Sequence, residues 1–297
     1  MLYFNLSTYL REKYGKRLKK ICIDGGFSCP NRDGKCGTGG CIYCGERGAG
    51  EHIDAKAGIA AQVKRALSGA KEDDAFIAYF QNFTNTYAPI DVLRERYDSA
   101  LTDDRIKILA IGTRPDCIDE EICELISEYA KEREVWVELG LQTASDQTAR
   151  IINRGYNTKT FDDAYRLLSE RGIKVVVHMI IGLPTESIDD FKYTADYIAS
   201  KHPFGVKIHS IYVMQGTVLA DLSLEKRYTP PTLEEYTAAA AYAVARMPRD
   251  TVIHRLTGDC PKDMLIAPDW NRNKSETISH VRDEMKKNGW SQGSLAD

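Results

Sequence analysis

The stretch DGGFSCPNRDGKCGTGGCIYCGERGAG, residues 24–50, holds four of the chain's eight cysteines within 16 residues. It directly follows KKICID, residues 19–24, a short β-branched apolar run that is typical of a strand. Six glycines between residues 34 and 48 would let so long a loop fold tightly around a bound group. The other four cysteines are scattered, and an isolated cysteine such as Cys123 is usually a small buried hydrophobe. We therefore expect the cysteine chemistry of this chain in the loop.

Two kinds of metal site suit these cysteines, because thiolates are soft ligands that favour zinc or iron-sulfur clusters. All four loop cysteines, spaced Cys-x6-Cys-x4-Cys-x2-Cys, would suit a closed structural zinc site. Three of them, Cys29, Cys41 and Cys44, would suit a 4Fe-4S cluster with one iron left open. In a parallel barrel the loops that follow the strands form the active face. The position of this loop therefore favours the cluster.

Outward from the loop, strand-like and helix-like segments alternate. Short apolar, β-branched runs begin near residues 20, 76, 107, 135, 174 and 206, mostly about 30 residues apart. Segments of helical period lie between them, for example one with Asp119 as N-cap that ends near Arg133. This spacing is typical of βαβ units, so we expect parallel strands covered by helices. The sequence predicts an α/β fold with a partial (βα)6 barrel, and a doubly wound open sheet is the alternative.

The segment VWVELGL, residues 135–141, helps to choose between the two folds. Alternation along a strand places Val135, Val137, Leu139 and Leu141 on one face. The opposite face would carry Trp136, Glu138, Gly140 and Gln142. Strands buried in a parallel sheet usually read as continuous apolar runs. A carboxylate and an amide on one face therefore predict a polar site inside the sheet.

The last part of the chain differs in pattern from the rest. After Met214 the periodicity weakens, and Pro230-Pro231 opens a region with one alanine-rich helix at residues 233–247. We expect residues 1–228 to form the barrel core with an N-terminal extension. Residues 229–297 are expected to form a small C-terminal accessory region.

Composition and charge bound the class of protein. With 43% hydrophobic and 28% charged residues, the 297-residue chain is ordinary for a globular protein. A formal net charge of -3 gives no global attraction to nucleic acid, so an RNA substrate would need a local basic patch. No apolar run has the length of a signal peptide or of a membrane span, so we expect a cytoplasmic protein without membrane contact.

Several motifs resemble segments of radical S-adenosylmethionine (SAM) enzymes. Cys41-Ile42-Tyr43-Cys44, with an aromatic residue before the last cysteine, is similar to the end of their cluster loop. The catalytic subunit of Elongator and its relatives have segments that resemble GTRPDCID at 112–119, ELGLQTASDQTARIINRGY at 138–156 and HMIIGLPTES at 178–187. A more specific similarity, to the YtqA/YhcC-like (MnmL) subfamily, rests on DGGFSCPNRDG at 24–34, YFQNFTNTYAP at 79–89 and HRLTGDCPKDMLIAPDW at 254–270. The long spacing between the first two cluster cysteines is similar to that of this subfamily, which would make Cys36 a bystander.

The resemblance implies a 4Fe-4S cluster held by Cys29, Cys41 and Cys44, whose open iron binds SAM. One reducing electron then yields a 5′-deoxyadenosyl radical that abstracts hydrogen from the substrate, while the protein supplies placement. Contacts to SAM are implied mainly at polar groups near the strand ends. The predicted cofactor-binding residues are Tyr43, Gln81, Asn82, Thr113, Arg114, Glu138, Gln142, Arg154 and Met214. We assign no role to His178, because a histidine in an apolar strand is more often a core residue.

Similarity to MnmL proteins implies a tRNA wobble uridine as substrate. The implied reaction takes the 5-carboxymethylaminomethyl group to the aminomethyl form in the synthesis of mnm5(s2)U, which a partner methyltransferase completes. An electron donor such as flavodoxin or ferredoxin is expected. Basic stretches could contact phosphates, although such runs are often solvated faces. The predicted tRNA contacts are Lys16, Arg17, Lys19, Lys20, Arg272 and Lys274.

Two other functions fit parts of the same sequence. A radical SAM enzyme that acts on a small molecule such as a porphyrin would share the barrel motifs and need no basic surface. A zinc-stabilised RNA-binding protein without catalysis would use the four-cysteine reading of the loop. The iron content of the protein would separate the second function from the first.

Overall fold

The computed structural model describes residues 2–48, 50, 53 and 56–296. Within these residues, seven parallel strands form one sheet, in the order β1-β2-β3-β4-β5-β6-β8. The strands are β1 (Lys19–Ile23), β2 (Phe76–Phe80), β3 (Ile106–Thr113), β4 (Glu134–Gln142), β5 (Lys174–Ile181), β6 (Gly205–Ser210) and β8 (Val252–Arg255). Two short strands, β7 (Val213–Met214) and β9 (Leu265–Ala267), pair antiparallel outside this sheet. The α-helices are α1 (Leu6–Tyr14), α2 (Ile59–Leu67), α3 (Ile90–Ala100), α4 (Glu120–Glu132), α5 (Asp146–Ile151), α6 (Thr158–Glu170), α7 (Ile188–Ser200), α8 (Val218–Leu224), α9 (Leu233–Arg246) and α10 (Lys274–Lys287).

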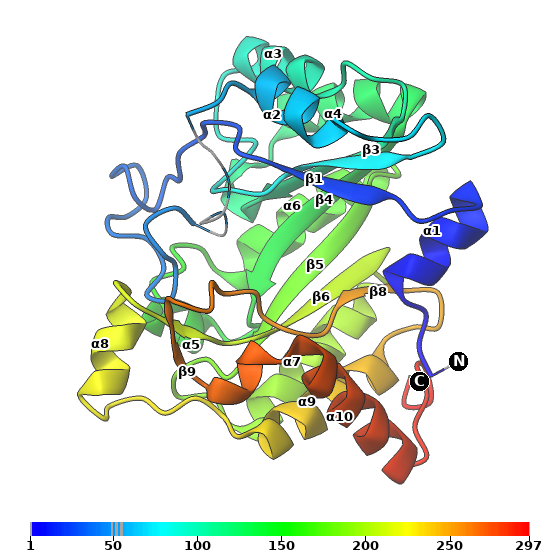
Figure 1. The fold of residues 1–297 in the computed structure, drawn as a ribbon. Helices are drawn as coiled ribbons and strands as arrows, with labels where there is room; N and C mark the ends of the chain where they lie inside the picture. The colour runs from blue at the N-terminus through cyan, green and yellow to red at the C-terminus, as the bar shows by residue number, and fades with distance from the viewer. Residues whose placement is uncertain (1, 49, 51–52, 54–55, 297) are drawn as a thin grey trace.

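The sheet curls into a half-barrel (Figure 1). Its strand order follows the chain without a reversal, which is the order of a barrel rather than of a doubly wound sheet. All six predicted strands are present. The predicted α/β fold with a partial barrel is therefore confirmed.

Strand β8 adds a seventh strand that the sequence did not reveal. It pairs in parallel with β6 and comes from the region that we expected to be accessory. Only two of its four residues, Val252 and Ile253, are apolar, and the next two are His254 and Arg255. So short a segment carries no readable alternation. The division of the chain near residue 228 stays a prediction.

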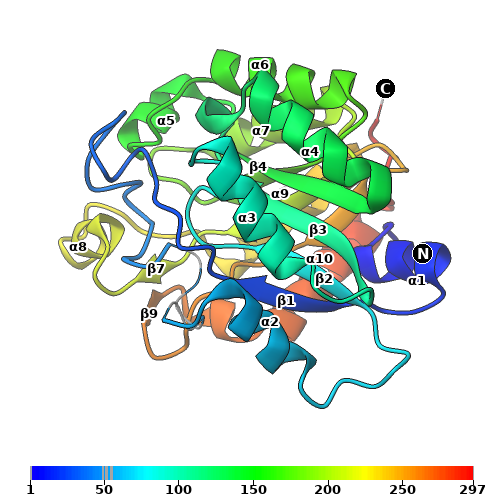
Figure 2. The ribbon, with the colours of Figure 1, turned by 90° about the horizontal axis from the view of Figure 1, so that it is seen from above.

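Most helices cover the outer face of the sheet, where they form the larger hydrophobic core. Figure 2 shows α2, α3, α4 and α6 along this side of the curved sheet. Buried residues of these helices, and of α7 and α9, belong to one hydrophobic cluster with the outward side chains of the strands. Val135, Val137, Leu139 and Leu141 of β4 all lie in this cluster, as the alternation predicted. Trp136 instead belongs to a separate cluster inside the curl.

The lower interior is filled by this second hydrophobic cluster. Strand residues Ile77, Ile108, Trp136 and Val176 pack there against Leu10 of α1. Helix α1 begins at the N-cap Asn5, whose backbone also bridges to Ile253 of β8. The segment before β1 thus reaches the opposite edge strand. It closes the amino end of the half-barrel.

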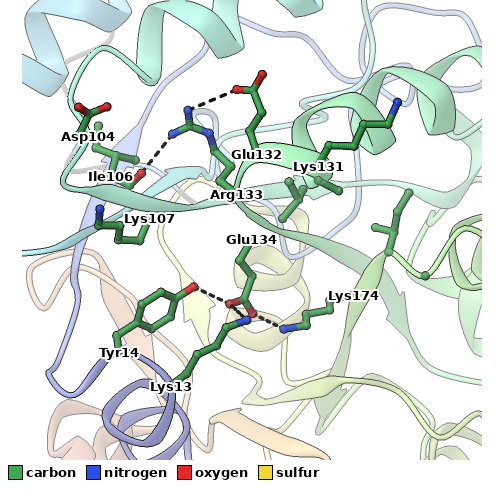
Figure 3. Close-up of a pocket in the computed structure, with 14 residues that line it drawn as sticks. Lys13, Tyr14, Asp104, Ile106, Lys107, Lys131, Glu132, Arg133, Glu134 and Lys174 are labelled. Carbon is green, nitrogen blue, oxygen red and sulfur yellow. Dashed lines mark hydrogen bonds and ion pairs between the residues drawn. The ribbon is translucent and has the colours of Figure 1, made fainter.

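One carboxylate ties this closure together. Figure 3 shows Glu134, the first residue of β4, with Lys13, Tyr14 and Lys174 directed at its carboxylate. Lys13 Nζ, Lys174 Nζ and the Tyr14 hydroxyl each lie 2.6 Å from it. Tyr9 and the Trp136 indole also donate to it, and the side chain of Glu134 is only 4% exposed.

The two ends of the sheet have different surroundings. The cysteine loop and α8 lie beyond the carboxyl ends of the strands (Figure 1). Both views place α1 and the two chain termini at the opposite end (Figures 1 and 2). In the described part of the chain, we find no helix that combines the length and the apolar character needed to cross a membrane.

We predict that Glu134→Gln destabilises the fold by about 3 kcal/mol at neutral pH. Burial by itself would raise the pKa of Glu134, but hydrogen bonds from Lys13, Lys174, Tyr14 and Tyr9 outweigh burial and lower it from 4.5 to about 2. A lowered pKa stabilises the fold above the unfolded value, and this contribution is lost as the pH falls through the folded value. Urea unfolding at pH 7 measures the loss. The exposed neighbour Glu132→Gln is the control and should change stability by less than about 0.5 kcal/mol; equal losses would contradict the assignment.

Candidate active site

One arginine of the cysteine loop binds the backbone at the end of the same loop. The Arg32 guanidinium donates to the carbonyls of Cys44 (3.1 Å), Gly45 (2.5 Å) and Glu46 (3.2 Å). It also lies over the Phe83 ring, 5.6 Å from the ring centroid. These contacts link residues 12 to 14 positions apart. They fix the backbone at the end of the loop, next to the last cysteine, Cys44.

A second clamp joins the loop to the segment after α5. The buried Asn31 amide donates to the Asn153 carbonyl (2.6 Å), and its nitrogen lies 3.9 Å from Cys41 Sγ. The Asn153 side chain in turn donates to the Gly40 carbonyl (2.7 Å). A Cβ on Gly37 would lie 2.2 Å from Asn31 Oδ1, so this position needs glycine.

The clamped loop brings three thiols to one cavity. Cys29, Cys41 and Cys44 line it together, at the carboxyl end of the sheet. Burial, and next the neighbouring Cys44, raise the pKa of Cys41 to about 12. The Cys36 thiol is directed elsewhere, with Asp116 Oδ2 at 3.7 Å and Arg114 Nη2 at 3.6 Å. Three thiols on one wall fit a cluster, whose irons replace the thiol protons.

Polar groups from three strand ends line the same cavity. Gln81 follows β2, Thr113 ends β3 and Gln142 ends β4. Tyr43 of the cysteine loop also contributes to the lining. Gln142 has a left-handed backbone with φ 68°, where the register between β4 and β5 shifts. Such strain outside glycine is most frequent at functional sites.

Arg114 lines the cavity but already has an anionic partner. Its guanidinium binds both carboxylate oxygens of Asp116, at 2.9 and 2.7 Å, and donates to the Arg154 carbonyl (3.0 Å). The same group lies 4.8 Å from the centroid of the Tyr156 ring. A contact of Arg114 with the SAM carboxylate stays a prediction.

Three other predicted residues are buried and do not line the cavity. The buried Asn82 amide donates to Asp24 Oδ2 (2.6 Å). Arg154 is fully buried, and it donates to the carbonyls of Thr143 (2.7 Å) and Tyr156 (3.0 Å). Met214 is 1% exposed and pairs with β9. A contact of these three residues with SAM stays a prediction.

Glu138 lies below the strand ends, inside the barrel. Its carboxylate is in close contact with the Lys207 ammonium and 3.2 Å from His178 Nε2. Burial by itself would raise the pKa of Glu138, but Lys207 and His178 hold it well below its usual range. Burial lowers the pKa of Lys207 to about 7, against the opposing effect of Glu138. The polar interior predicted from β4 is therefore present.

The predicted tRNA contacts fall into separate places. Lys16 donates to the Asp73 carbonyl (2.6 Å) and Lys19 pairs with Asp74 (2.6 Å), at the amino end of β1. The exposed Arg17 lies between them in sequence. Lys20 is exposed, and its Nζ lies 4.7 Å from the centroid of the Tyr79 ring, which belongs to the inner hydrophobic cluster.

Arg272 and Lys274 lie near the cavity. Lys274 and Arg255 both pair with Asp259, and Arg255 lines the cavity. Arg272 donates to the carbonyls of Lys262 (2.6 Å) and Leu265 (2.9 Å).

Comparison with known proteins identifies the family. The model of the Radical SAM superfamily matches residues 34–198, and that of the Radical_SAM C-terminal domain matches residues 203–287. The chain belongs to the radical SAM superfamily. It is 36% identical to YtqA of Bacillus subtilis over 98% of this chain and 92% of that protein. It is 35% identical to YhcC of Escherichia coli K12 over 89% of this chain and 86% of that protein.

More distant relatives of this radical SAM protein share the barrel. The tRNA uridine(34) acetyltransferase of Methanocaldococcus infernus is 28% identical over 60% of this chain and 35% of that protein. The solved Elp3 of Methanocaldococcus infernus superposes with a TM-score of 0.69 at 21% identity, over 93% of this chain and 64% of that one. Streptococcus suis SuiB, solved with S-adenosylmethionine, gives 0.54 at 15% identity, over 86% and 54%. These superpositions show the shared fold.

Family membership decides between the metal readings. The protein is an enzyme that uses a 4Fe-4S cluster and SAM, and the reading as a zinc-stabilised protein without catalysis is wrong. Cys29, Cys41 and Cys44, which line the cavity together, would hold the cluster. When bound, the cluster and SAM supply the radical that abstracts hydrogen from the substrate. The chain's own residues orient the substrate and keep water out.

The sequence reading missed several residues of the cavity. Asn31 and Tyr156 support or line it near the cysteines, and Tyr79, Lys207 and His209 line it deeper in the barrel. His178, to which we assigned no role, binds Glu138 and lines it too. The alternation that predicted an inward-facing Glu138 also holds in β5 and β6. Applied there, it places His178, Lys207 and His209 on the inner face of the sheet.

We predict that alanine at Cys29, Cys41 or Cys44 abolishes the cluster and with it SAM cleavage, because each supplies one of three thiolates. Cys36→Ala is the matched control from the same loop and should keep both, since its thiol is directed at Asp116. Iron and sulfide analysis of anaerobically purified protein, with assay of 5′-deoxyadenosine, makes the measurement. A cluster that survives Cys29→Ala but not Cys36→Ala would reverse the ligand assignment.

Proposed function

We propose that this radical SAM enzyme modifies the wobble uridine of tRNA. In this proposal it converts the carboxymethylaminomethyl side chain to the aminomethyl form in mnm5(s2)U synthesis. The main support is similarity over 60% of the chain to a protein named for its action on uridine 34 of tRNA. The motifs at 24–34, 79–89 and 254–270, which resemble MnmL proteins, narrow the proposed step.

The shape of the site is compatible with a nucleotide substrate. The cavity runs from the three cysteines at the carboxyl end down to Glu138 inside the barrel. A base can reach such a depth only when it is unstacked from its neighbours. Anticodon loops are single-stranded, and their bases can be turned out in this way. A wobble uridine could therefore present its side chain toward the barrel interior.

Several parts of the proposal concern partners. A methyltransferase would complete the modification, and flavodoxin or ferredoxin would supply the electron. Both partners, and the cytoplasmic location, stay predictions from the sequence. The alternative is a radical SAM enzyme that acts on a small molecule such as a porphyrin. The experiment below would favour this alternative if the tRNA nucleosides are unchanged.

Deleting the gene should make tRNA accumulate 5-carboxymethylaminomethyluridine, with or without 2-thiolation, while the methylaminomethyl form falls. Nucleoside analysis of total tRNA by mass spectrometry gives both amounts. Complementation with the wild-type gene should restore the profile, and complementation with Cys41→Ala should not, because that chain lacks one of the three predicted cluster ligands. An unchanged profile, in an organism without a second pathway, would reject the tRNA proposal.

The positions of the basic residues predict which of them touch tRNA. Lys274 is linked to the cavity wall through Asp259, whereas Lys16 lies at the far end of β1. Replacing Arg272 and Lys274 by Gln should therefore weaken tRNA binding. The slope of the logarithm of the binding constant against the logarithm of the salt concentration should become less steep by about two. Lys16→Gln with Arg17→Gln is the comparison pair and should change the slope less. Binding titrations at several salt concentrations make the measurement, and thermal unfolding checks that the variants fold. A larger loss of tRNA affinity in the comparison pair would place tRNA at the amino end of the sheet.

A further inference from the structure

A layer of charged and polar side chains lies inside the barrel, between the cysteines and the hydrophobic lower interior. We call it the interior charged layer. It consists of Tyr79, Glu138, His178, Lys207, His209 and Arg255, with the exposed Lys20 at its edge, over the Tyr79 ring. All of these except Lys20 line the same cavity as Cys29, Cys41 and Cys44. A group that enters past the cluster would therefore reach this layer.

The layer carries more positive than negative charge. Lys207, 2% exposed, contacts the Glu138 carboxylate and donates to the Tyr79 hydroxyl (3.1 Å). Lys207 and Lys20 lie over the same Tyr79 ring, with Nζ 4.5 and 4.7 Å from its centroid. Arg255 adds a third cation, whose Asp259 partner is 3.5 Å away and itself 46% exposed. Three cations thus face one internal carboxylate.

Cations gathered around a cavity repel one another unless an opposite charge is supplied. Burial lowers the pKa of Lys207, and repulsion from Lys20 and Arg255 lowers it further. The layer also has an unused polar atom, since His209 Nε2 is buried without a hydrogen-bond partner among the residues that the structure describes. Cations and a free ring nitrogen in a cavity wall suit an anionic group of a ligand.

We propose that the interior charged layer binds the carboxylate end of a glycine-like zwitterion on the substrate. Lys20, Lys207 and Arg255 face its carboxylate, and Glu138 faces its ammonium nitrogen. The inference rests on the proposed function, because the carboxymethylaminomethyl side chain is such a zwitterion. Glu138 favours this assignment over a phosphate, because a carboxylate attracts an ammonium group and repels a dianion.

The test compares two substrates with the cluster-loaded enzyme. One is an anticodon stem-loop RNA with the carboxymethylaminomethyl side chain, and the other carries the same side chain as its neutral primary amide. We expect the wild-type enzyme to favour the carboxylate by roughly 100-fold in kcat/KM. Lys20→Met and Lys207→Met should bring this ratio toward one. Lys107→Met, an exposed lysine at the amino end of β3, is the matched control and should keep the ratio.

The ratio separates this role from other effects of the same substitutions. Loss of a phosphate contact would slow both substrates equally and leave the ratio unchanged. Lys20 is exposed, so its replacement should not disturb folding. Cluster content and substrate-free SAM cleavage check the folding of Lys207→Met, which leaves Glu138 without its ammonium partner. An unchanged ratio in both variants would overturn the inference.

A second probe works even if neither RNA is a substrate, which would be the failure of the proposed function. Cys22 is exposed on β1, and Lys20, Lys207 and Arg255 all lower its pKa against the raising effect of desolvation. Iodoacetate is anionic and iodoacetamide is neutral, so their rate ratio at Cys22 reports the attraction for a carboxylate. Peptide mapping of the cluster-loaded enzyme should show this ratio fall roughly tenfold in Lys20→Met and Lys207→Met. Equal ratios in all variants would reject carboxylate binding in the layer.

Discussion

The edges of the curled sheet impose the constraint on which the rest of the structure depends. In the described part of the chain β1 pairs with β2 and β8 pairs with β6, so the two edge strands do not join. A full barrel fills its interior with layers of side chains that close on themselves, whereas this half-barrel needs other segments at both ends. At the amino end, α1 reaches from β1 to Ile253, and Glu134 holds it there. At the carboxyl end, the cysteine loop closes the opening.

Charged groups fill the middle of the interior, and packing alone does not explain them. A buried ion pair such as Glu138 with Lys207 adds little stability over a hydrophobic pair of similar volume, because both charges lose their water. The neighbouring layer below is mostly hydrophobic, with Trp136 and Val176. Hydrophobic filling was therefore possible in this fold, and the charges one layer higher are better explained by a ligand than by stability.

The sequence predicted the fold, and it predicted three cysteines that the structure brings to one cavity, because both depend on local patterns. Strand alternation and loop spacing are read within a few residues, as with Glu138 and the three cysteines. Whether a polar residue at a strand end lines the cavity depends on distant partners. Asn82 turns into the wall because Asp24, 58 residues earlier, accepts its amide hydrogen bond. The sequence could not predict that Arg255 lines the cavity, because its strand β8 forms only through pairing with β6.

The basic stretch before β1 shows how the same charges can be read in two ways. In sequence, Lys13, Lys16 and Lys19 form part of a run that resembles a phosphate-binding edge. In the fold each one has a local partner, in Glu134, the Asp73 carbonyl and Asp74. Lys20, the next residue, lies on the other face of β1 because a strand alternates its faces, and its ammonium lies over the Tyr79 ring. Adjacent positions along the chain therefore separate charges that hold the amino end together from a charge that lies beside the interior charged layer.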